Sequence, residues 1–208
     1  MAVECDHVVY AVTNLAEGIA EIEALTGVQA TPGGQHQGIG TRNALMDFGN
    51  GSYLEIIGPD PDQPEPAEPR PFCIDQLSHG HLAAWAARTS DLDTVVATAR
   101  AAGYDPGDVR DMSRATPEGA LLEWRLATLM ERQLVEIVPF LIDWGSTPHP
   151  SKSCATGCRL LSLRAVHPDV ERLSSQLAAV GATIDVDHGA AAELIAELDT
   201  PKGRVILR

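Results

Sequence analysis

The chain has 208 residues, of which 29 are acidic and 15 are basic, and its formal net charge at pH 7 is −14. Such an acidic chain repels nucleic-acid phosphates and anionic lipids, so we expect no nucleic-acid partner and no membrane partner. No apolar run approaches the roughly 20 residues that span a bilayer, and the N-terminus does not resemble a secretory signal, which makes the cytoplasm the expected location.

The chain opens with a predicted strand and helix. Residues 3–12 are rich in β-branched side chains, and a period of two places His7 on the face opposite Val8. Asn14 is a good N-cap for the helix that follows, and Gly27 is a typical residue just after a helix C-terminus.

A glycine-rich segment and a hairpin complete the first unit. Residues 31–41 contain four glycines and one proline, which predicts a loop, and a short strand is expected near 28–31. Segments 42–48 and 52–57 flank an Asn-Gly pair, the strongest short-range signal for a β-hairpin.

The second unit follows a connector. Residues 59–71 contain six prolines and several acidic side chains, a composition typical of an extended, solvated linker. Beyond it we predict a strand at 81–88, a helix at 91–102 and a hairpin that pairs 121–129 with 134–142.

A shorter third unit ends the chain. It contains a predicted strand at 160–165, a helix begun by Pro168 in its first turn, a strand near 183–186 and a hairpin between 194–198 and 205–207. The three glycines that close the predicted helices, Gly27, Gly103 and Gly181, are 76 and 78 positions apart. Near-constant spacing of this kind indicates a duplicated module, and each copy has the order βαβββ.

These patterns divide the chain into five segments. They are a first module (1–58), a Pro-rich linker (59–78), a second module (79–145), a second linker (146–157) and a compact third copy (158–208).

Together, these elements resemble the vicinal oxygen chelate superfamily and, within it, proteins with a glyoxalase-like domain. The stretches that carry the resemblance are 6–12, 34–36 with 40–45, 53–57 and 139–145. The resemblance implies an α+β fold of repeated βαβββ modules (the glyoxalase/bleomycin resistance/extradiol dioxygenase-like fold). Two paired modules would form a cupped sheet, and the third copy would be additional.

The resemblance also implies a divalent metal on the concave face, held by the opening and closing strands of each module. Mapped onto this sequence, the first module supplies His7 and Glu55, a donor pair that suits Zn, Mn, Fe, Co or Ni. The second module departs from the pattern, because Ala84 stands where its histidine is expected. His36 in the glycine-rich segment is our candidate for a third ligand. Glu136 or Asp143 is a further possible ligand, but the sequence does not fix the register of either.

Five residues are candidates for the chemistry and for substrate binding. Glu55 is the strongest, since a carboxylate among Tyr, Leu and Ile in an inner strand is costly to bury without a metal, proton or partner. Glu55 and His36 are the candidate catalytic groups. Arg42 and Asn43 are candidates for holding a polar or anionic ligand, although an exposed hairpin end explains them nearly as well. Trp144 could form a cavity wall or a plug at a strand end.

Other histidines and the cysteines suggest no site. The spacing of Cys154, Cys158 and His149 invites a zinc interpretation, but no fourth ligand is nearby, so reduced thiols are expected. We expect His149, His167 and His188 to be solvated.

Three functions are compatible with this sequence. The leading one is a small-molecule enzyme of the glyoxalase-like kind, with metal-assisted lyase or isomerase chemistry, or dioxygenase-type chemistry, at a carbonyl or vicinal-oxygen substrate. The second is a protein of the same fold that binds and sequesters a small molecule without turnover. In the third, the third copy covers a sheet edge or builds a homodimer.

Overall fold

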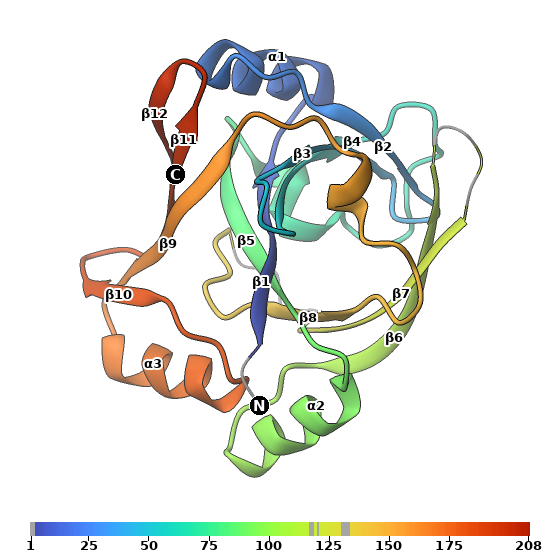
Figure 1. Cartoon of the computed structure of the whole chain (residues 1–208). Helices are drawn as coiled ribbons and strands as arrows, with labels where there is room; N and C mark the ends of the chain where they lie inside the picture. Colours follow the sequence, from blue (N-terminus) through green and yellow to red (C-terminus); the bar gives the residue numbers. More distant parts are fainter. Residues whose placement is uncertain (1–2, 117–118, 120, 130–133) are drawn as a thin grey trace.

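The computed structural model describes residues 3–116, 119, 121–129 and 134–208. Within this part, eight strands form a closed barrel in the order β1-β4-β3-β2-β6-β7-β8-β5 (Figure 1). Their bounds are Glu4–Ala11 (β1), Thr31–His36 (β2), Thr41–Asp47 (β3), Tyr53–Pro59 (β4), His81–Arg88 (β5), Asp108–Ala115 (β6), Leu121–Thr128 (β7) and Phe140–Asp143 (β8). Helices α1 (Leu15–Thr26) and α2 (Leu92–Ala101) follow β1 and β5, so each half of the barrel is a βαβββ module.

The two modules pair with each other, and their strands form one closed barrel. Strand β1 pairs antiparallel with β5 on one side, and on the other side β2 meets β6 through a single registered pair, Gln35 with Ala115. A Cβ atom at Gly34 would collide with the carbonyl oxygen of Ala115, so glycine at this position permits the close approach of β2 to β6.

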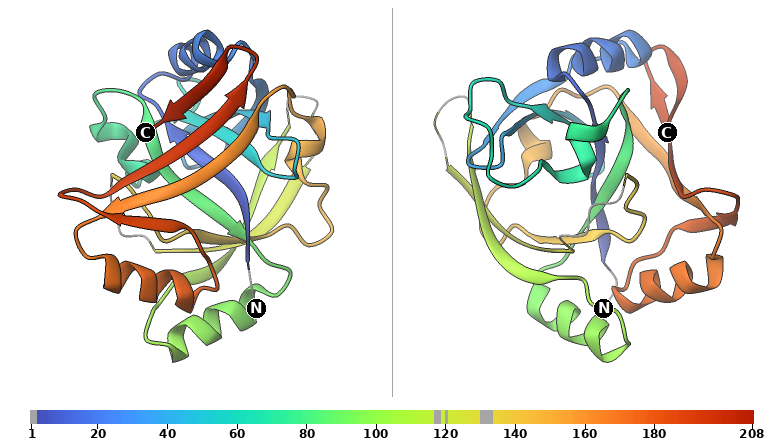
Figure 2. Two further views of the ribbon diagram at one scale, coloured as in Figure 1. Left: turned by 60° about the vertical axis from the view of Figure 1, so that its left-hand side comes forward. Right: turned by 180° about the vertical axis from the view of Figure 1, so that it is seen from behind.

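The third βαβββ copy forms a separate four-stranded sheet in the order β10-β9-β11-β12 (Figure 2). Its elements are β9 (Arg159–His167), α3 (Val170–Ala179), β10 (Asp185–His188), β11 (Glu193–Thr200), and β12 (Gly203–Leu207). The backbone N–H of Leu82 in β5 donates to the carbonyl oxygen of Arg208, which ties the end of the chain to the barrel. Homodimer formation stays a prediction, which the mass of the protein in solution would test.

One hydrophobic core joins the barrel to the third copy. The same cluster of buried side chains includes Val8 and Leu54 from the barrel and Leu198 from β11. We therefore expect Leu198→Ala to lower the free energy of unfolding of the whole chain by about 2–5 kcal/mol, in a single urea transition. The matched control, Ile206→Ala at an exposed position of β12, should change it by less than about 1 kcal/mol. Two separate transitions in Leu198→Ala would contradict a shared core.

Several local expectations are wrong. Residues 31–36 are strand β2, so His36 ends a strand and does not lie in a loop. The sequence does not predict strand β6, because its inner face carries arginines in place of an apolar alternation. The predicted arm 134–142 forms a strand only at β8, and residues 130–133 of the predicted hairpin lie outside the described residues. Helix α3 is capped by Asp169, so Pro168 precedes the helix.

The proline-rich connector packs against the barrel and is not a free linker. Arg70 fixes it by donating to the carbonyl oxygen of Gly40 and by pairing with Glu65 and Asp75. The segment continues into a 3-10 turn, η1 (Pro71–Gln76), in which Phe72 has a φ of 56°. Glu68, Pro69, Pro71 and Phe72 line the cavity described below.

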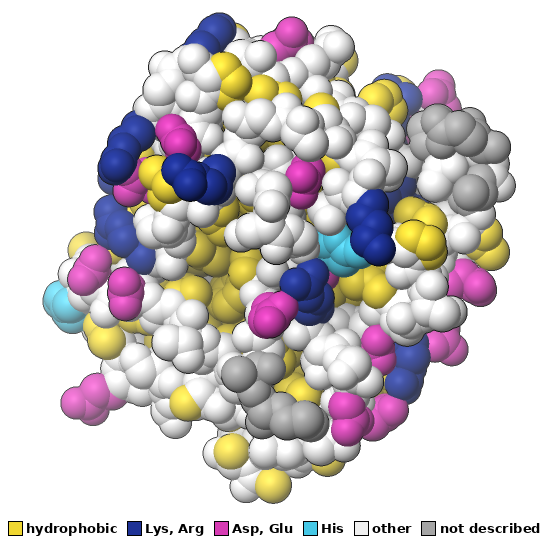
Figure 3. All heavy atoms as spheres, viewed as in Figure 1, with side chains coloured by type: hydrophobic (Ala, Val, Ile, Leu, Met, Phe, Trp, Pro, Cys, Tyr) yellow, Lys and Arg dark blue, Asp and Glu magenta, His cyan; other side chains and the backbone are white. Residues whose placement is uncertain are grey.

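The surface shows no single acidic face in the view of Figure 3. Acidic and basic side chains alternate there around a hollow in which hydrophobic side chains are visible. Among the described residues, no helix is both long enough and apolar enough to cross a membrane.

Candidate active site inside the barrel

The barrel encloses a cavity of about 390 Å³. Its wall is mostly hydrophobic and aromatic, with contributions from Met112, Trp124, Leu126, Phe140 and Trp144. The polar side chains that reach it include His7, His36, Asn43, Glu55, Arg110, Arg114 and Glu136. An apolar cavity with a few convergent polar groups is the usual form of a small-molecule site.

His7 is held rigidly by a buried carboxylate and by two rings. The pairing of β1 with β5 shifts register between Cys5 and His7, and this bulge lets Asp6 turn toward the side chain of His7. Asp6 Oδ1 lies 2.6 Å from His7 Nδ1. The imidazole stacks on Tyr53 with ring centroids 4.7 Å apart and meets the edge of Phe140. His7 therefore presents Nε2 in one fixed direction.

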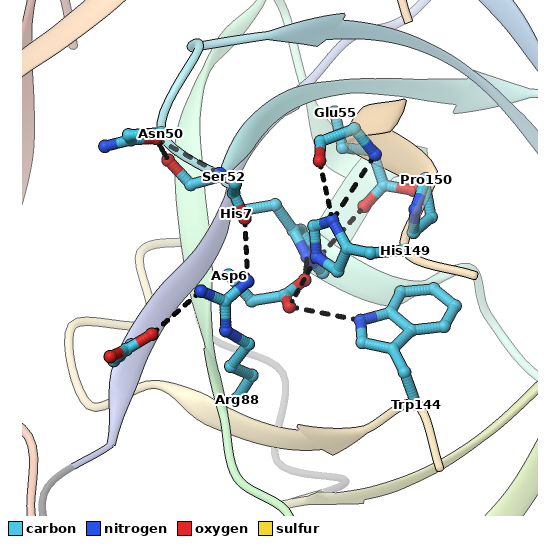
Figure 4. Close-up of polar contacts among 12 residues, drawn as sticks. Asp6, His7, Asn50, Ser52, Glu55, Arg88, Trp144, His149 and Pro150 are labelled. Atoms are coloured by element: carbon cyan, nitrogen blue, oxygen red, sulfur yellow. Dashed lines mark hydrogen bonds and ion pairs between the residues drawn. The ribbon is translucent and has the colours of Figure 1, made fainter. Parts of the chain in front are cut away.

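Asp6 is ionised in this arrangement. Burial by itself would raise its pKa, but hydrogen bonds from His149 and His7 outweigh burial and hold the pKa well below its usual value. The ionised carboxylate accepts a hydrogen bond from the Nδ1–H group of His7, so the lone pair of neutral His7 is on Nε2. Figure 4 shows Asp6, His7, Glu55, Trp144 and His149 gathered in one cluster.

Glu55 lies between His7 and His36. Its Oε2 is 3.6 Å from His7 Nε2, and its Oε1 is 4.0 Å from His36 Nε2. Asn43 donates from Nδ2 to Glu55 Oε1 at 2.5 Å. The Glu55 residue is only 8% exposed, so these three neighbours form most of its polar environment.

His36 also presents an unprotonated Nε2. Its Nδ1 lies 2.9 Å from Thr41 Oγ1, and Asn43 Nδ2 lies 3.4 Å from Nε2. Because an amide NH₂ group only donates, Nε2 is the acceptor, and the ring proton is on Nδ1. Burial lowers the pKa of His36, which keeps this imidazole neutral near pH 7.

The Glu55 oxygens thus face two lone-pair nitrogens, and neither distance is that of a good hydrogen bond. A proton or a cation between acceptors removes their repulsion. Two ligand atoms on one zinc ion with bonds of about 2.1 Å lie about 3.4 Å apart, close to the 3.6 Å between His7 and Glu55. In the described part of the chain, no three His, Cys, Asp or Glu side chains form a complete metal site as they stand. The donor set of His7 and Glu55 fits a divalent cation, and His36 would join it only by moving several tenths of an ångström closer.

The family comparison agrees with this fold and cavity. A model of the glyoxalase-like domain matches residues 5–181. The chain belongs to the glyoxalase-like domain family. The resemblance to the vicinal oxygen chelate superfamily is therefore confirmed. No curated protein matches the chain.

Several solved structures are similar to this glyoxalase-like protein. A hypothetical protein from Staphylococcus aureus is 14% identical, with a TM-score of 0.67 over 92% of this chain and 88% of that chain. A methylmalonyl-CoA epimerase from Mycobacterium tuberculosis is 20% identical over 67% of this chain and 86% of its own, with a TM-score of 0.44. A variant of the Streptomyces coelicolor methylmalonyl-CoA epimerase in complex with 2-nitronate-propionyl-CoA has 18% identity and a TM-score of 0.45 over 71% of this chain and 100% of its own. Similarity at these levels carries no information on the chemistry.

Among its described residues, the second module of this glyoxalase-like protein places no metal ligand opposite His7. Ala84 in β5 pairs with Val9 and has no donor atom. Strand β8 lines the cavity with Phe140 and Ile142. Asp143 accepts from the backbone N–H of Gly145 and is not among the described residues that line the cavity.

Trp144 and His149 hold the outer side of Asp6. Trp144 Nε1 donates to Asp6 Oδ2 at 3.1 Å, and His149 Nε2 lies 2.9 Å from the same oxygen. The expectation that His149 is solvated is wrong, since the 3-10 turn η2 (Pro150–Ser153) after it brings it onto Asp6. Trp144 lines the cavity and packs on Trp124, with centroids 5.3 Å apart.

Arg42 points elsewhere than the cavity. Its guanidinium pairs with Asp62 at 3.1 Å and Asp60 at 3.7 Å, and it is not among the described residues that line the cavity. The four cysteines are free thiols, as expected.

Four residues of the site were missed in the sequence: Asp6, Arg110, Arg114 and Trp124. Asp6 is next to His7 in the sequence, but no sequence pattern predicts the bulge that turns its side chain inward. The arginines alternate with Met112 along β6, which is a period-two signal once the strand is recognised.

Glu136 is another carboxyl group at the cavity, and burial raises its pKa to about 7. Because the folded pKa exceeds the ordinary value of 4.5, the folded state loses stability as pH rises between 4.5 and 7. We expect Glu136→Gln to be more stable than the wild type at pH 8 by up to about 3 kcal/mol, and equally stable at pH 4. Urea unfolding at both pH values measures this difference. A difference that does not change with pH would contradict it.

Proposed function

We propose that this protein is a small-molecule enzyme that moves a proton at a carbon next to a carbonyl or vicinal oxygen, in a lyase or isomerase reaction. The observation that supports the proposal is the convergence of Glu55, His7 and His36 on one side of an apolar cavity, with their acceptor atoms facing each other. Groups of this kind contribute about 10²–10⁴-fold to proton-transfer rates when they are positioned in advance.

Each residue has a defined part in this proposal. Asp6 orients His7, and Asn43 fixes the Glu55 carboxylate through its amide group. With a cation on His7 and Glu55, His36 keeps an unprotonated Nε2 to accept the proton. In the cation-free site, the Glu55 carboxylate is the base. The apolar wall excludes water, which strengthens these interactions.

A divalent Zn, Mn, Fe, Co or Ni ion would be held by His7 and Glu55. If His36 moved closer and became the third ligand, its Nε2 would bind the ion and would no longer serve as the base. When bound, it supplies Lewis-acid polarisation of the substrate oxygen. The same oxygen could be one of two vicinal oxygens, as in dioxygenase-type chemistry. The orientation of His7 by Asp6 supports this assignment, because a carboxylate on the second ring nitrogen is typical of metal-bound histidines.

The experiment that tests the proposal is proton exchange in D₂O. The probe is 4-phenyl-2-oxobutanoate, which has an apolar ring and exchangeable protons beside its carbonyl, and exchange is followed by proton NMR with and without added Mn²⁺ or Zn²⁺. We expect the protein to accelerate exchange above the rate with the metal alone. No acceleration for this probe or for a panel of 2-oxo acids and ketones would overturn the proposal.

The second candidate function is a non-catalytic protein that binds a small molecule. The aromatic pair Trp124 and Trp144 favours it, because two adjacent indoles form a wall for a flat apolar or cationic ligand. In this case Trp144→Ala abolishes binding and Glu55→Gln leaves it intact.

A further inference from the structure

Two arginines project into the cavity from one face of strand β6. Arg114 is only 4% exposed. Arg110, Met112 and Arg114 alternate along the strand and therefore share its inner face, where all three line the cavity. One amino group of Arg114 donates to the carbonyl oxygen of Gly33, across the seam between β2 and β6. That bond fixes the guanidinium, and a guanidinium has five N–H donors to satisfy.

These two arginines differ from the others in their partners. Ten of the twelve arginines that the structure describes form an ion pair with an acidic side chain. Arg110 and Arg114 form none with the described acidic residues, and both line the cavity. In a chain with a net charge of −14, this pairing pattern is not due to a shortage of carboxylates. Arg114 is buried, whereas Arg110 is exposed. The buried guanidinium of Arg114 is costly without a counter-charge, so an anion from outside the chain would stabilise it.

We propose that Arg114, assisted by Arg110, binds the carboxylate of a mainly apolar substrate. The assignment rests on the proposed function, in which this cavity is the active site. A planar carboxylate with two oxygens matches the remaining face of a guanidinium that is already held on one side.

The position of Arg114 explains why the carboxylate would matter for the reaction. Arg114 donates to Gly33 in β2, the strand that ends at His36, and both side chains line the cavity. A substrate held by its carboxylate at Arg114 therefore has its neighbouring carbons beside His36 and Glu55. Its apolar remainder then extends toward Trp124 and Trp144, which line the same cavity.

The test compares two probes of the same shape, 4-phenylbutanoate and 4-phenylbutanamide. Binding to the full-length protein is measured by calorimetry and by the fluorescence of the cavity tryptophans. We expect the wild type to bind the carboxylate at least about tenfold more tightly than the amide. Arg114→Gln should remove this preference without changing affinity for the amide, and Arg110→Gln should weaken it. The matched control is Arg125→Gln on β7, whose guanidinium pairs with Asp93 outside the cavity, and it should keep the preference.

Equal binding of the two probes by the wild type would overturn the inference, and so would an unchanged preference in Arg114→Gln. Tighter binding of phenyl phosphate than of 4-phenylbutanoate would overturn the assignment to carboxylate. If Arg114→Gln does not fold, the wild-type preference and Arg110→Gln decide the question. The proposed function is tested separately, by the exchange assay. If the protein prefers the carboxylate but does not accelerate exchange, the enzyme proposal is rejected and the carboxylate subsite is retained. If it accelerates exchange but shows no preference, the subsite is rejected and the enzyme proposal is retained.

Discussion

Replacing Glu55 with glutamine is expected to reduce proton exchange at least about 100-fold while the fold is retained. Glutamine has the size of glutamate and can still accept from Asn43, so the local packing is preserved. It removes the negative charge that faces His7 and His36, and with it both the base and one cation ligand. Exchange of 4-phenyl-2-oxobutanoate and the melting temperature of the variant measure the two halves of this expectation.

The control for Glu55→Gln is Glu4→Gln. Glu4 is a carboxylate in the same module, paired with Arg88 at the surface, and its replacement should leave exchange unchanged. Exchange that persists in Glu55→Gln at the wild-type rate would remove Glu55 from the reaction.

Asp6→Asn is expected to impair both stability and reaction. The carboxylate is fully buried and accepts from His7, Trp144 and His149, so an amide in its place turns one of these contacts into a clash of donors. Loss of a buried hydrogen-bonded charge costs about 3 kcal/mol. His7 would also lose the acceptor that fixes its tautomer, and exchange should fall at least about 100-fold. Urea unfolding and the exchange assay measure the two effects.

The stability effect of Asp6→Asn should depend on pH in one direction. The folded pKa of Asp6 is held below its ordinary value of 3.8, so its contribution is fully present above pH 3.8. This contribution is lost as pH falls through the folded pKa. The difference in the free energy of unfolding between the wild type and Asp6→Asn should therefore be constant from pH 5 to 7. Asp62→Asn, at an exposed ion pair with Arg42, should show no such difference. If Asp6→Asn lowers the free energy of unfolding at pH 6 no more than Asp62→Asn does, the role assigned to Asp6 is wrong.

The modular fold was predictable because its signals are local. Asn14 and Gly27 bound α1, and the Asn-Gly pair at 50–51 turns β3 into β4. Alternation along β1 correctly separated Val8 from Val9, which lie in different hydrophobic clusters. Closure of the barrel was not predictable, because it depends on a short seam between β2 and β6 from different modules, where Gln35 and Ala115 form the one registered pair.

The site was predictable only in part, for a similar reason. The parity of β1 and β4 brings His7 and Glu55 together, and His36 reaches them from the end of β2. The roles of Asp6 and His149 depend on a bulge and on a contact between residues 143 positions apart. The arginines of β6 were missed because an inner face that binds a polar ligand does not have the apolar pattern of a core strand.

The most direct test of the central claim is the metal content of the 208-residue chain, measured by mass spectrometry for the wild type, His7→Ala and His188→Ala. If His7 and Glu55 form a cation site, the wild type and the exposed-histidine control should carry about one transition metal per chain, and His7→Ala should carry none. A wild-type protein without metal, and without thermal stabilisation by added Zn²⁺, Mn²⁺, Ni²⁺ or Co²⁺, would contradict it.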